Sequence, residues 1–265
     1  MKDIHEKNRH AWEEAYDNAS TAFLERTERM LKTNPKGLFS KELDEALQTL
    51  AGPGKTLCQF CSNNGRETMA ALAYGFSHTV GFDITRNMTD AANRMAKDLG
   101  LEASFVQTDI LELEGYGHAF DVLLVTVGAL TWFKDLDAFF EVAGRVVKPG
   151  GTVLIEEIHP FSNMLAIEGE EGYDPESPRK IVHSYFKDDP WVEEDGMGYM
   201  TGQSGISKPF VSYSHTFSEI LNGLSKNGFA LEHLTETDVD SAGMFETLSG
   251  KGYPLTYVLV SKKTK

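Results

Sequence analysis

The chain has two cysteines, Cys58 and Cys61, in the stretch 57-LCQFCSNNGRET-68, where an apolar run gives way to a polar turn and then to a helical pattern. Three interpretations are open: a Cys-x-x-Cys redox or metal site, a nucleotide-binding turn, or a plain strand-to-helix turn. Side chains alternate along a strand, so these two thiols diverge unless the chain turns between them. Because no second cysteine pair or histidine cluster completes a zinc set, we predict no metal site.

The turn 61-CSNNG-65 has features that suit a bound anion. It leads into 66-RET-68, which opens a helix, and free backbone amides at a helix N-terminus attract carboxylates and phosphates. Gly65 would let a ligand approach the backbone closely, and Asn63 can adopt a positive φ at some cost. The G-x-G-x-x-G spacing is absent, so the turn alone does not distinguish a cofactor loop from a plain turn.

Carboxylates follow the next two predicted strands. Asp83 ends 80-VGFD-83, eighteen positions after Gly65, and an acid about 20 residues on can accept from ribose hydroxyls. Asp109 lies in 107-QTDI-110, where it could accept from an adenine amine. After the fourth strand, residues 126–128 could pass under a cofactor and residues 129–133 could line a reaction cavity. The structural alternatives are solvated or helix-capping aspartates and ordinary aromatic packing.

Short apolar runs alternate with helical patterns through the middle of the chain, which is typical of βαβ units on a parallel sheet. The predicted strands are Thr56–Phe60, Thr79–Phe82, Ala103–Gln107, Phe120–Val127, Thr152–Glu156, Phe229–Leu234 and Tyr257–Ser261. Helices are predicted within 8–32 and over 40–50, 67–74, 88–99 and 136–147, with a last one that begins at the capping box 216-TFSE-219. In such sheets a ligand lies outside the carboxyl ends of the strands, where the turn and both aspartates are expected.

The expected fold is therefore α/β, a doubly wound, mostly parallel, Rossmann-like sheet of seven strands. We predict one domain over 1–265: N-terminal helices (1–52), a cofactor-binding core (53–160), a β-rich cap inserted after strand five (161–215), and a C-terminal helix and strands (216–265). The cap is expected from Gly, Pro and aromatic content and from the alternating runs 181-IVHSYF-186 and 210-FVSYSH-215.

Charge and composition limit the partners. The formal net charge is −15, which disfavours nucleic acid and an anionic membrane and favours a small molecule. The N-terminus lacks the apolar region of a signal peptide and no apolar run is long enough to span a bilayer, so we expect a cytoplasmic protein with reduced thiols. A monomer or a homodimer is compatible with these features.

The order of strand ends resembles the class I S-adenosylmethionine-dependent methyltransferases. In that family strand one ends in hh-Asp-h-Gly-x-Gly-x-Gly, an acid ends strand two, an Asp follows strand three, and Lys-Pro-Gly-Gly precedes strand five. Here Gln59 falls on the first acid, Cys61 and Asn63 on two glycines and Gly65 on the third, while Asp83, Asp109 and 148-KPGG-151 match. A subgroup with Cys-Gln, Asn-Asn-Gly-Arg-Glu and Glu-x-His-Pro, whose substrates are unassigned, is more similar still.

The resemblance implies S-adenosylmethionine as cofactor, S-adenosylhomocysteine as product, and methyl transfer to a small molecule by in-line displacement. The cofactor-binding residues it implies are Tyr16, Gln59, Cys61, Ser62, Asn63, Gly65, Asp83, Ile84, Met88, Thr108, Asp109, Ile110, Thr126 and Val127. Since Gln59 offers no charge to the cofactor's amino group, Tyr16 or Trp12 could close over the site instead. A non-catalytic protein that binds the cofactor is the alternative.

Candidate substrate contacts or bases are His159, His215 and Tyr185. His159 directly follows strand five and precedes Pro160, which places it in an extended segment at the ligand edge of the sheet. Each has a structural alternative: a buried histidine, support for the helix cap at Thr216, or packing within the cap. A nicotinamide-dependent oxidoreductase shares the layered fold, but it normally needs the absent glycine spacing.

Overall fold

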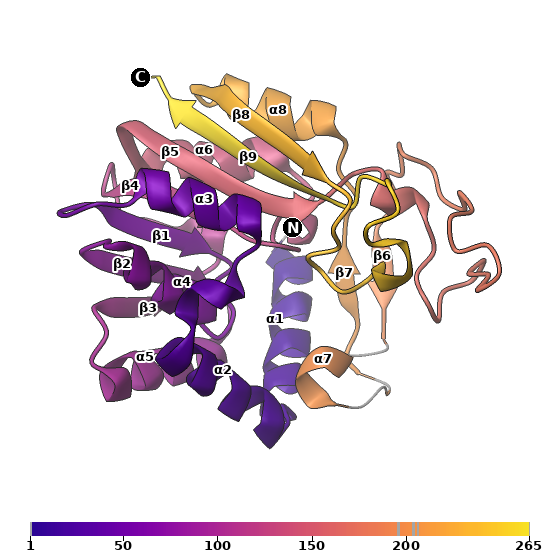
Figure 1. Cartoon of the computed structure of the whole chain (residues 1–265), viewed down its shortest axis with the longest axis horizontal. Helices are drawn as coiled ribbons and strands as arrows, with labels where there is room; N and C mark the ends of the chain where they lie inside the picture. The colour runs from indigo at the N-terminus through magenta and orange to yellow at the C-terminus, as the bar shows by residue number, and fades with distance from the viewer. Residues whose placement is uncertain (1, 195–196, 203–204, 206, 265) are drawn as a thin grey trace.

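Seven strands form one sheet in the order β3-β2-β1-β4-β5-β9-β8 in a computed structural model that describes residues 2–194, 197–202, 205 and 207–264 (Figure 1). Their bounds are β1 Thr56–Phe60, β2 His78–Asp83, β3 Ala103–Gln107, β4 Phe120–Val125, β5 Val147–Ile158, β8 Phe229–Thr237 and β9 Thr256–Lys263. The first five are parallel, and β9 runs antiparallel to both β5 and β8. The predicted doubly wound α/β fold is confirmed.

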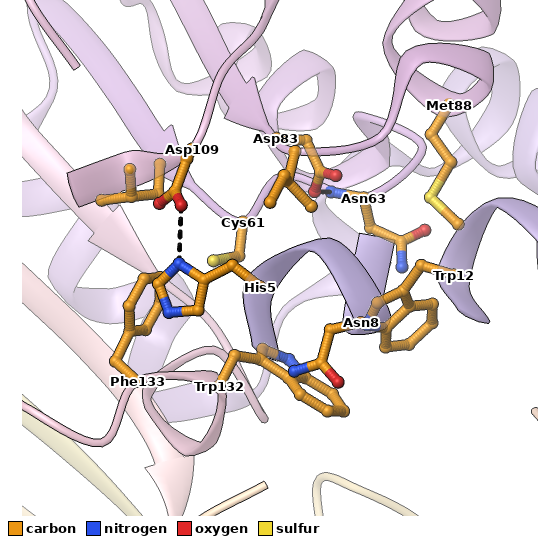
Figure 2. Close-up of a pocket in the computed structure, with 12 residues that line it drawn as sticks. His5, Asn8, Trp12, Cys61, Asn63, Asp83, Met88, Asp109, Trp132 and Phe133 are labelled. Carbon is orange, nitrogen blue, oxygen red and sulfur yellow. Dashed lines mark hydrogen bonds and ion pairs between the residues drawn. The ribbon is translucent and has the colours of Figure 1, made fainter. Parts of the chain in front are cut away.

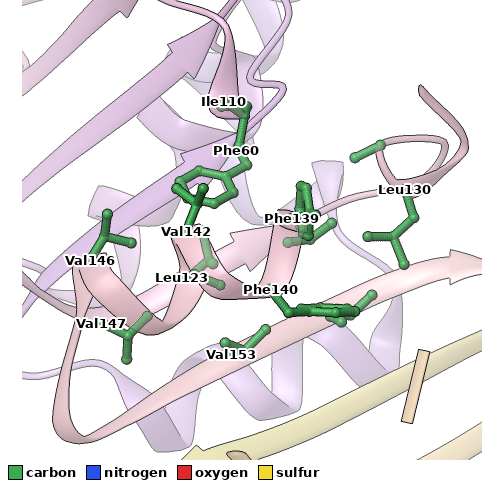
Figure 3. Close-up of a cluster of buried hydrophobic side chains, with 14 of the residues drawn as sticks. Phe60, Ile110, Leu123, Leu130, Phe139, Phe140, Val142, Val146, Val147 and Val153 are labelled. Atoms are coloured by element: carbon green, nitrogen blue, oxygen red, sulfur yellow. The ribbon is translucent and has the colours of Figure 1, made fainter. Parts of the chain in front are cut away.

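Helices cover both faces because successive side chains of the central strands are apolar on both sides. One face carries α6 and α8, whose Phe139, Phe140 and Leu224 join Phe60 and Leu123 in the largest core cluster (Figure 3). The helices are α1 Lys2–Asp17, α2 Thr21–Thr33, α3 Lys41–Leu50, α4 Arg66–Ala70, α5 Arg86–Leu99, α6 Leu136–Val146, α7 Gly198–Thr201 and α8 Phe217–Lys226. Single 3₁₀ turns span Pro35–Leu38, Ala71–Tyr74, Ile110–Glu112, Leu130–Trp132, Ser162–Met164 and Glu246–Leu248.

The other face packs against α3, α4 and α5. Leu43 and Leu47 of α3 contact Leu57 and Leu124, and Phe105 of β3 lies in a cluster with Met69 of α4 and two alanines of α5. In each strand these side chains point away from the α6 face. Both layers leave the carboxyl ends of β1 to β5 at one side of the molecule, which α1 adjoins (Figure 1).

The predicted helical region 8–32 divides into α1 and α2. The break comes at Ser20, whose side chain accepts from the amide of Phe23 and so caps α2. Helix α1 stands between the sheet and the cap (Figure 1). At the other end of the chain, the capping box of α8 forms as predicted, with Thr216 and Glu219 bonded reciprocally.

The cap contains less regular β structure than predicted. Strands β6 (Trp191–Glu193) and β7 (Phe210–Ser212) form a small antiparallel sheet, but the run 181–186 is not a strand and Ile181 makes one isolated bridge to Leu165. The amides of Val182 and His183 both donate to the carbonyl of Met164. Because two successive amides share one acceptor, the pairing does not continue as a β-ladder. Within the part of the chain described, no helix has the length and apolarity needed to cross a membrane.

Candidate functional site

The turn after β1 has the left-handed backbone of a glycine-rich loop, although Cys61 and Asn63 stand at two of its three left-handed positions. Cys61 and Asn63 have φ values of 55° and 51°, and Gly65 has 77°, all in the left-handed region. That conformation costs an ordinary residue about 1–2 kcal/mol, and Asn tolerates it best. The backbone amide of Asn63 donates to Asp83 Oδ2 at 2.7 Å, so the end of β2 holds the turn in place.

Gly65 is closely packed by neighbouring side chains. A Cβ added there would lie 2.4 Å from the ring of Phe105 and 2.9 Å from Cβ of Ala92. Glycine is therefore needed at position 65 for packing against Phe105 and for its positive φ, and the approach of a ligand to its backbone stays a prediction.

A small pocket lies at the carboxyl ends of β1, β2 and β3 (Figure 2). Its lining is Cys61, Asn63, Asp83, Ile84, Met88, Asp109 and Ile110, together with Trp132, Phe133 and three residues of α1, namely His5, Asn8 and Trp12. The first seven are among the predicted cofactor contacts. The pocket has a volume of only about 70 Å³, whereas small-molecule sites usually offer about 300–1,000 Å³.

Asp83 is buried, and both of its carboxylate oxygens accept hydrogen bonds from the protein. Besides the amide of Asn63, its carboxylate accepts from the amide and hydroxyl of Thr85 at 2.9 and 2.7 Å. Burial raises the pKa of Asp83, against these hydrogen bonds, which lower it. The carboxylate lines the small pocket and at the same time holds both the turn after β1 and the start of α5.

Helix α1 forms one wall of the small pocket with Trp12, which was expected there, and with His5 and Asn8, which the sequence reasoning did not predict. His5 Nδ1 lies 2.6 Å from Asp109 Oδ2, and the Trp12 ring packs edge-on against Trp132 (Figure 2). Asn8 donates to the carbonyl of Val211 and accepts from its amide, both at 2.8 Å. The spacing His5, Asn8, Trp12 places all three on one helix face, and this i, i+3, i+7 pattern is the signal that could have indicated an inward-facing polar stripe.

Asp109 is therefore occupied by a protein partner. Burial alone would raise the pKa of Asp109, but the hydrogen bond from His5 and the amide of Leu111 hold it below its ordinary value. Trp12 lines the pocket, as one of the two residues expected to close over it. Tyr16 does not: it packs against the cluster that contains Met88.

A large cavity of about 610 Å³ adjoins the small pocket and shares Trp12, Cys61, Asn63 and Trp132 with it. It opens between the ends of β4 and β5 and the cap, and its lining includes Thr126 and Val127, two of the predicted cofactor contacts. Its size is within the range for small-molecule sites.

Glu157, near the end of β5, is a functional candidate that the sequence reasoning missed. It lines the large cavity and is 5 % exposed. Its oxygens accept from the amides of Gly128 at 2.7 Å and Leu130 at 2.9 Å, which fixes the loop after β4. Burial raises the pKa of Glu157 to about 7, although these amides oppose the shift. Glu157 is the first residue of the Glu-x-His-Pro motif, whose position at the end of strand five is the signal that could have indicated it.

Several predicted contacts lie away from both cavities. Gln59 accepts from Thr68 Oγ1 at 2.5 Å and donates to Thr126 Oγ1 at 2.8 Å, so its amide joins α4 to the end of β4 and is not available to a ligand. Ser62 is fully buried beneath the turn, and the amide of Thr108 donates to the carbonyl of Asp83. Neither Ser62 nor Thr108 lines a pocket.

His159 and Tyr185 are also placed differently from the expectation. His159 Nδ1 accepts from the amide of Phe161 at 3.0 Å, so its Nε2 carries the proton and donates to Glu236 at 2.7 Å. Burial lowers the pKa of His159, and Glu236 opposes this. The Tyr185 hydroxyl accepts from the amide of Phe217 at the start of α8. Because neither side chain lines the cavities, their predicted roles as substrate contacts are not supported.

His215 does line the large cavity. Its Nε2 donates to the carbonyl of Phe133 at 2.8 Å, and within the described residues its buried Nδ1 has no hydrogen-bond partner. Burial lowers the pKa of His215, while Glu219 and the carbonyls of Phe133 and Leu130 raise it. In the neutral ring with its proton on Nε2, Nδ1 is an acceptor.

The thiols are unpaired. Cys58 is buried in the core and Cys61 lines both cavities. Burial, with the nearby charges of Asp83 and Glu157, raises the pKa of the Cys61 thiol well above its ordinary value, which disfavours a reactive thiolate. No group of three or more His, Cys, Asp or Glu among the described residues could hold a metal ion.

Residues 58–151 match a family model described as a methyltransferase domain. Over 118 residues the chain is 29 % identical to the ubiquinone/menaquinone biosynthesis C-methyltransferase UbiE of Bdellovibrio bacteriovorus, a match that covers 44 % of this chain and 46 % of the relative. The match thus spans about half the length of that curated relative.

Solved structures share the fold over most of the chain. An S-adenosylmethionine-dependent methyltransferase from Mesorhizobium loti is 21 % identical, with a TM-score of 0.60 over 85 % of this chain and 99 % of that one. Geranyl diphosphate C-methyltransferase from Streptomyces coelicolor was solved with Mg²⁺, geranyl diphosphate and S-adenosyl-L-homocysteine. It is 14 % identical, with a TM-score of 0.56 over 83 % of this chain and 78 % of that one. Magnesium protoporphyrin IX methyltransferase from Synechocystis is 14 % identical, with a TM-score of 0.55 over 96 % of this chain and 92 % of that one. The chain therefore has the fold of the S-adenosylmethionine-dependent methyltransferases, with a methyltransferase domain match at residues 58–151.

Proposed function

We propose that this protein is an S-adenosylmethionine-dependent methyltransferase that acts on a small-molecule acceptor. The observation that carries the proposal is the grouping of the left-handed turn at Cys61 and Asn63 with Asp83 and Asp109 around one pocket, directly beside a cavity of about 610 Å³. The sequence match over residues 58–151 supports the same activity.

The residues of the small pocket fit a nucleoside. Asp83 would accept from ribose hydroxyls, Ile84, Met88 and Ile110 would flank the adenine ring, and Asp109 would accept from its amine. The turn after β1 and residues 126–128 would hold the amino-acid part. Since the pocket has a volume of about 70 Å³, we expect α1 to withdraw before the cofactor binds.

When bound, S-adenosylmethionine supplies an electrophilic methyl group on a sulfonium with a good leaving group. The chain's own task is then to orient the acceptor at the junction of the two cavities and to exclude water. Trp12 and Trp132 border both cavities and provide an apolar wall at that junction.

Calorimetric titration with S-adenosylmethionine and S-adenosylhomocysteine tests the cofactor site. Micromolar binding is expected. It should be lost in Ile84→Trp, which fills the pocket, and kept in Asp90→Asn, an exposed residue of α5. Failure of the intact protein to bind either compound would refute the proposal.

A protein that binds the cofactor without catalysis is the second candidate, because α1 fills the nucleoside pocket and both strand-end aspartates already have protein partners. Formation of S-adenosylhomocysteine in the presence of an acceptor panel separates the two. Tight binding with no turnover on any acceptor would favour the regulatory function.

A further inference from the structure

Two polar atoms on the wall of the large cavity have no hydrogen-bond partner within the described chain: Tyr257 Oη and His215 Nδ1. Tyr257 is fully buried and His215 is 8 % exposed. Buried polar atoms without partners are costly, at about 1–3 kcal/mol each, and they are rare in native proteins. Because both atoms belong to residues on a cavity wall, a ligand in the cavity can bond to them.

Glu157 contributes a third acceptor position to the same wall. Its Oε2 accepts from the amides of Gly128 and Ile158, and its Oε1 accepts from Leu130. The amide of Ala129 also lowers the pKa of this carboxyl, and the part of Glu157 that lines the large cavity is the part that a ligand can reach. Glu157 and Tyr257 are directly paired across β5 and β9, which puts their side chains on one face and within reach of one ligand group.

The charge of the cavity selects against anions. Among the described residues, its charged lining consists of Glu67, Glu157, Glu170 and Glu193 and of the Arg66 guanidinium, which is bonded to Glu67 at 2.5 Å. His183 Nε2 lies 3.8 Å from Glu170. All three tryptophans of the chain also line the cavity. Carboxylates combined with aromatic faces are the chemistry that recognises ammonium groups.

We propose that the methyl acceptor is a small amine with an apolar body, whose ammonium group binds Glu157 and Tyr257 while His215 accepts a further N–H or O–H donor of the ligand. The inference rests on the proposed methyltransferase function and names the substrate class of the same site.

The same geometry gives Glu157 a role in activating the amine. A protonated amine has no free lone pair, so one proton must leave before nitrogen can attack. That proton passes from the ammonium to Glu157, which leaves a neutral amine and a carboxylic acid. Burial raises the pKa of Glu157 to about 7, which suits this exchange.

The other titratable groups around Glu157 do not compete for this role. The pKa values of Tyr257 and of Cys61 are raised by burial and by the charge of Glu157, so both stay neutral. His215, whose pKa burial lowers, lines the same cavity as a neutral acceptor.

Binding of matched probes tests the proposal. With saturating S-adenosylhomocysteine, 2-phenylethylamine, 2-phenylethanol and 3-phenylpropionate are titrated by calorimetry and by tryptophan fluorescence, which reports on this cavity. We expect the amine to bind at least tenfold more tightly than the carboxylate. Glu157→Gln should weaken the amine at least tenfold more than it weakens the alcohol or S-adenosylhomocysteine, whose binding it affects only through the loop after β4, while Glu176→Gln, an exposed cap residue, changes nothing.

Tyr257→Phe provides a second variant whose fold is not at risk, because it removes an unsatisfied buried hydroxyl. It should keep or raise thermal stability and still weaken the amine severalfold. Equal or tighter binding of the carboxylate, no amine binding to the complex, or an equal loss of S-adenosylhomocysteine in Glu157→Gln would overturn the proposal and leave the proposed function standing. Absence of S-adenosylhomocysteine binding to the intact protein would instead remove the proposed function itself.

Discussion

His5 Nδ1 and Asp109 Oδ2 lie 2.6 Å apart and join the first turn of α1 to the segment that follows β3, across the mouth of the small pocket. The contact occupies the carboxylate that we expect to meet an adenine amine. Under the proposed function, cofactor binding would compete with this contact, and the apparent affinity would be the intrinsic affinity multiplied by the fraction of molecules in which α1 is open.

His5→Ala should increase the affinity for S-adenosylhomocysteine by about tenfold to a hundredfold, because a charge-assisted hydrogen bond of about 1.5–3 kcal/mol no longer holds α1 closed. Calorimetry measures the change, with His10→Ala on the exposed face of α1 as the control. Weaker binding in His5→Ala would show that His5 contacts the ligand and does not compete with it.

Asp83→Asn should both destabilise the protein and weaken cofactor binding. An amide cannot accept on its nitrogen, so either Asn63 or Thr85 loses its partner, at a cost of about 1–3 kcal/mol in the free energy of unfolding. Urea denaturation measures the loss of stability, and calorimetry measures cofactor binding on the same preparation under conditions in which the variant is folded. A destabilised variant that binds the cofactor normally would limit Asp83 to holding the turn.

The stability of Cys61 variants should depend more on how well the new residue tolerates a positive φ than on the size of its side chain. Cys61→Gly removes the strain of a φ of 55° and should change the free energy of unfolding by less than about 1 kcal/mol, because lost packing offsets the relief. Cys61→Val places a β-branched residue in that region and should cost about 1–3 kcal/mol. Similar stability of the two variants, measured by urea denaturation, would contradict a left-handed Cys61.

Glu157 should make stability fall as pH rises. Its pKa is raised from 4.5 to about 7 in the folded state, so between these values the folded protein holds more protons than the unfolded chain. This contribution is fully present below pH 4.5 and is lost as the pH rises through 7, a change on the order of 3 kcal/mol.

The difference in unfolding free energy between the wild type and Glu157→Gln isolates that contribution, because other buried groups titrate equally in both. Relative to the wild type, the variant should gain stability from pH 5 to pH 8. Glu176→Gln should follow the wild type at each pH. A difference that is constant with pH would show that Glu157 has an ordinary pKa.

Strand ends were predictable because parallel strands buried on both faces leave continuous apolar runs, and the polar residue that ends each run marks the edge of the sheet. This reasoning placed Asp83 and Asp109 at one pocket, as the structure confirms. Asn63, a residue type that tolerates a positive φ, has a φ of 51° in the turn after β1.

Side-chain partners between distant segments were not predictable in the same way. His159 follows β5 as expected, but it is bonded to Glu236 of β8, and no local pattern links two residues 77 positions apart. Gln59 likewise looked like a weakened cofactor contact, although it bonds Thr68 and Thr126. The position of α1 over the pocket depends on tertiary packing that a helical period does not specify.

The pairing of Asn8 with Val211 also concerns aggregation. The side-chain amide of Asn8 donates to and accepts from the backbone of β7, as a neighbouring strand would. A short two-stranded sheet is marginal by itself, and an unpaired edge is a template for association between molecules. When α1 withdraws from the pocket, that edge loses its cover, so the helix that restricts entry of a ligand also protects the cap from edge-to-edge association.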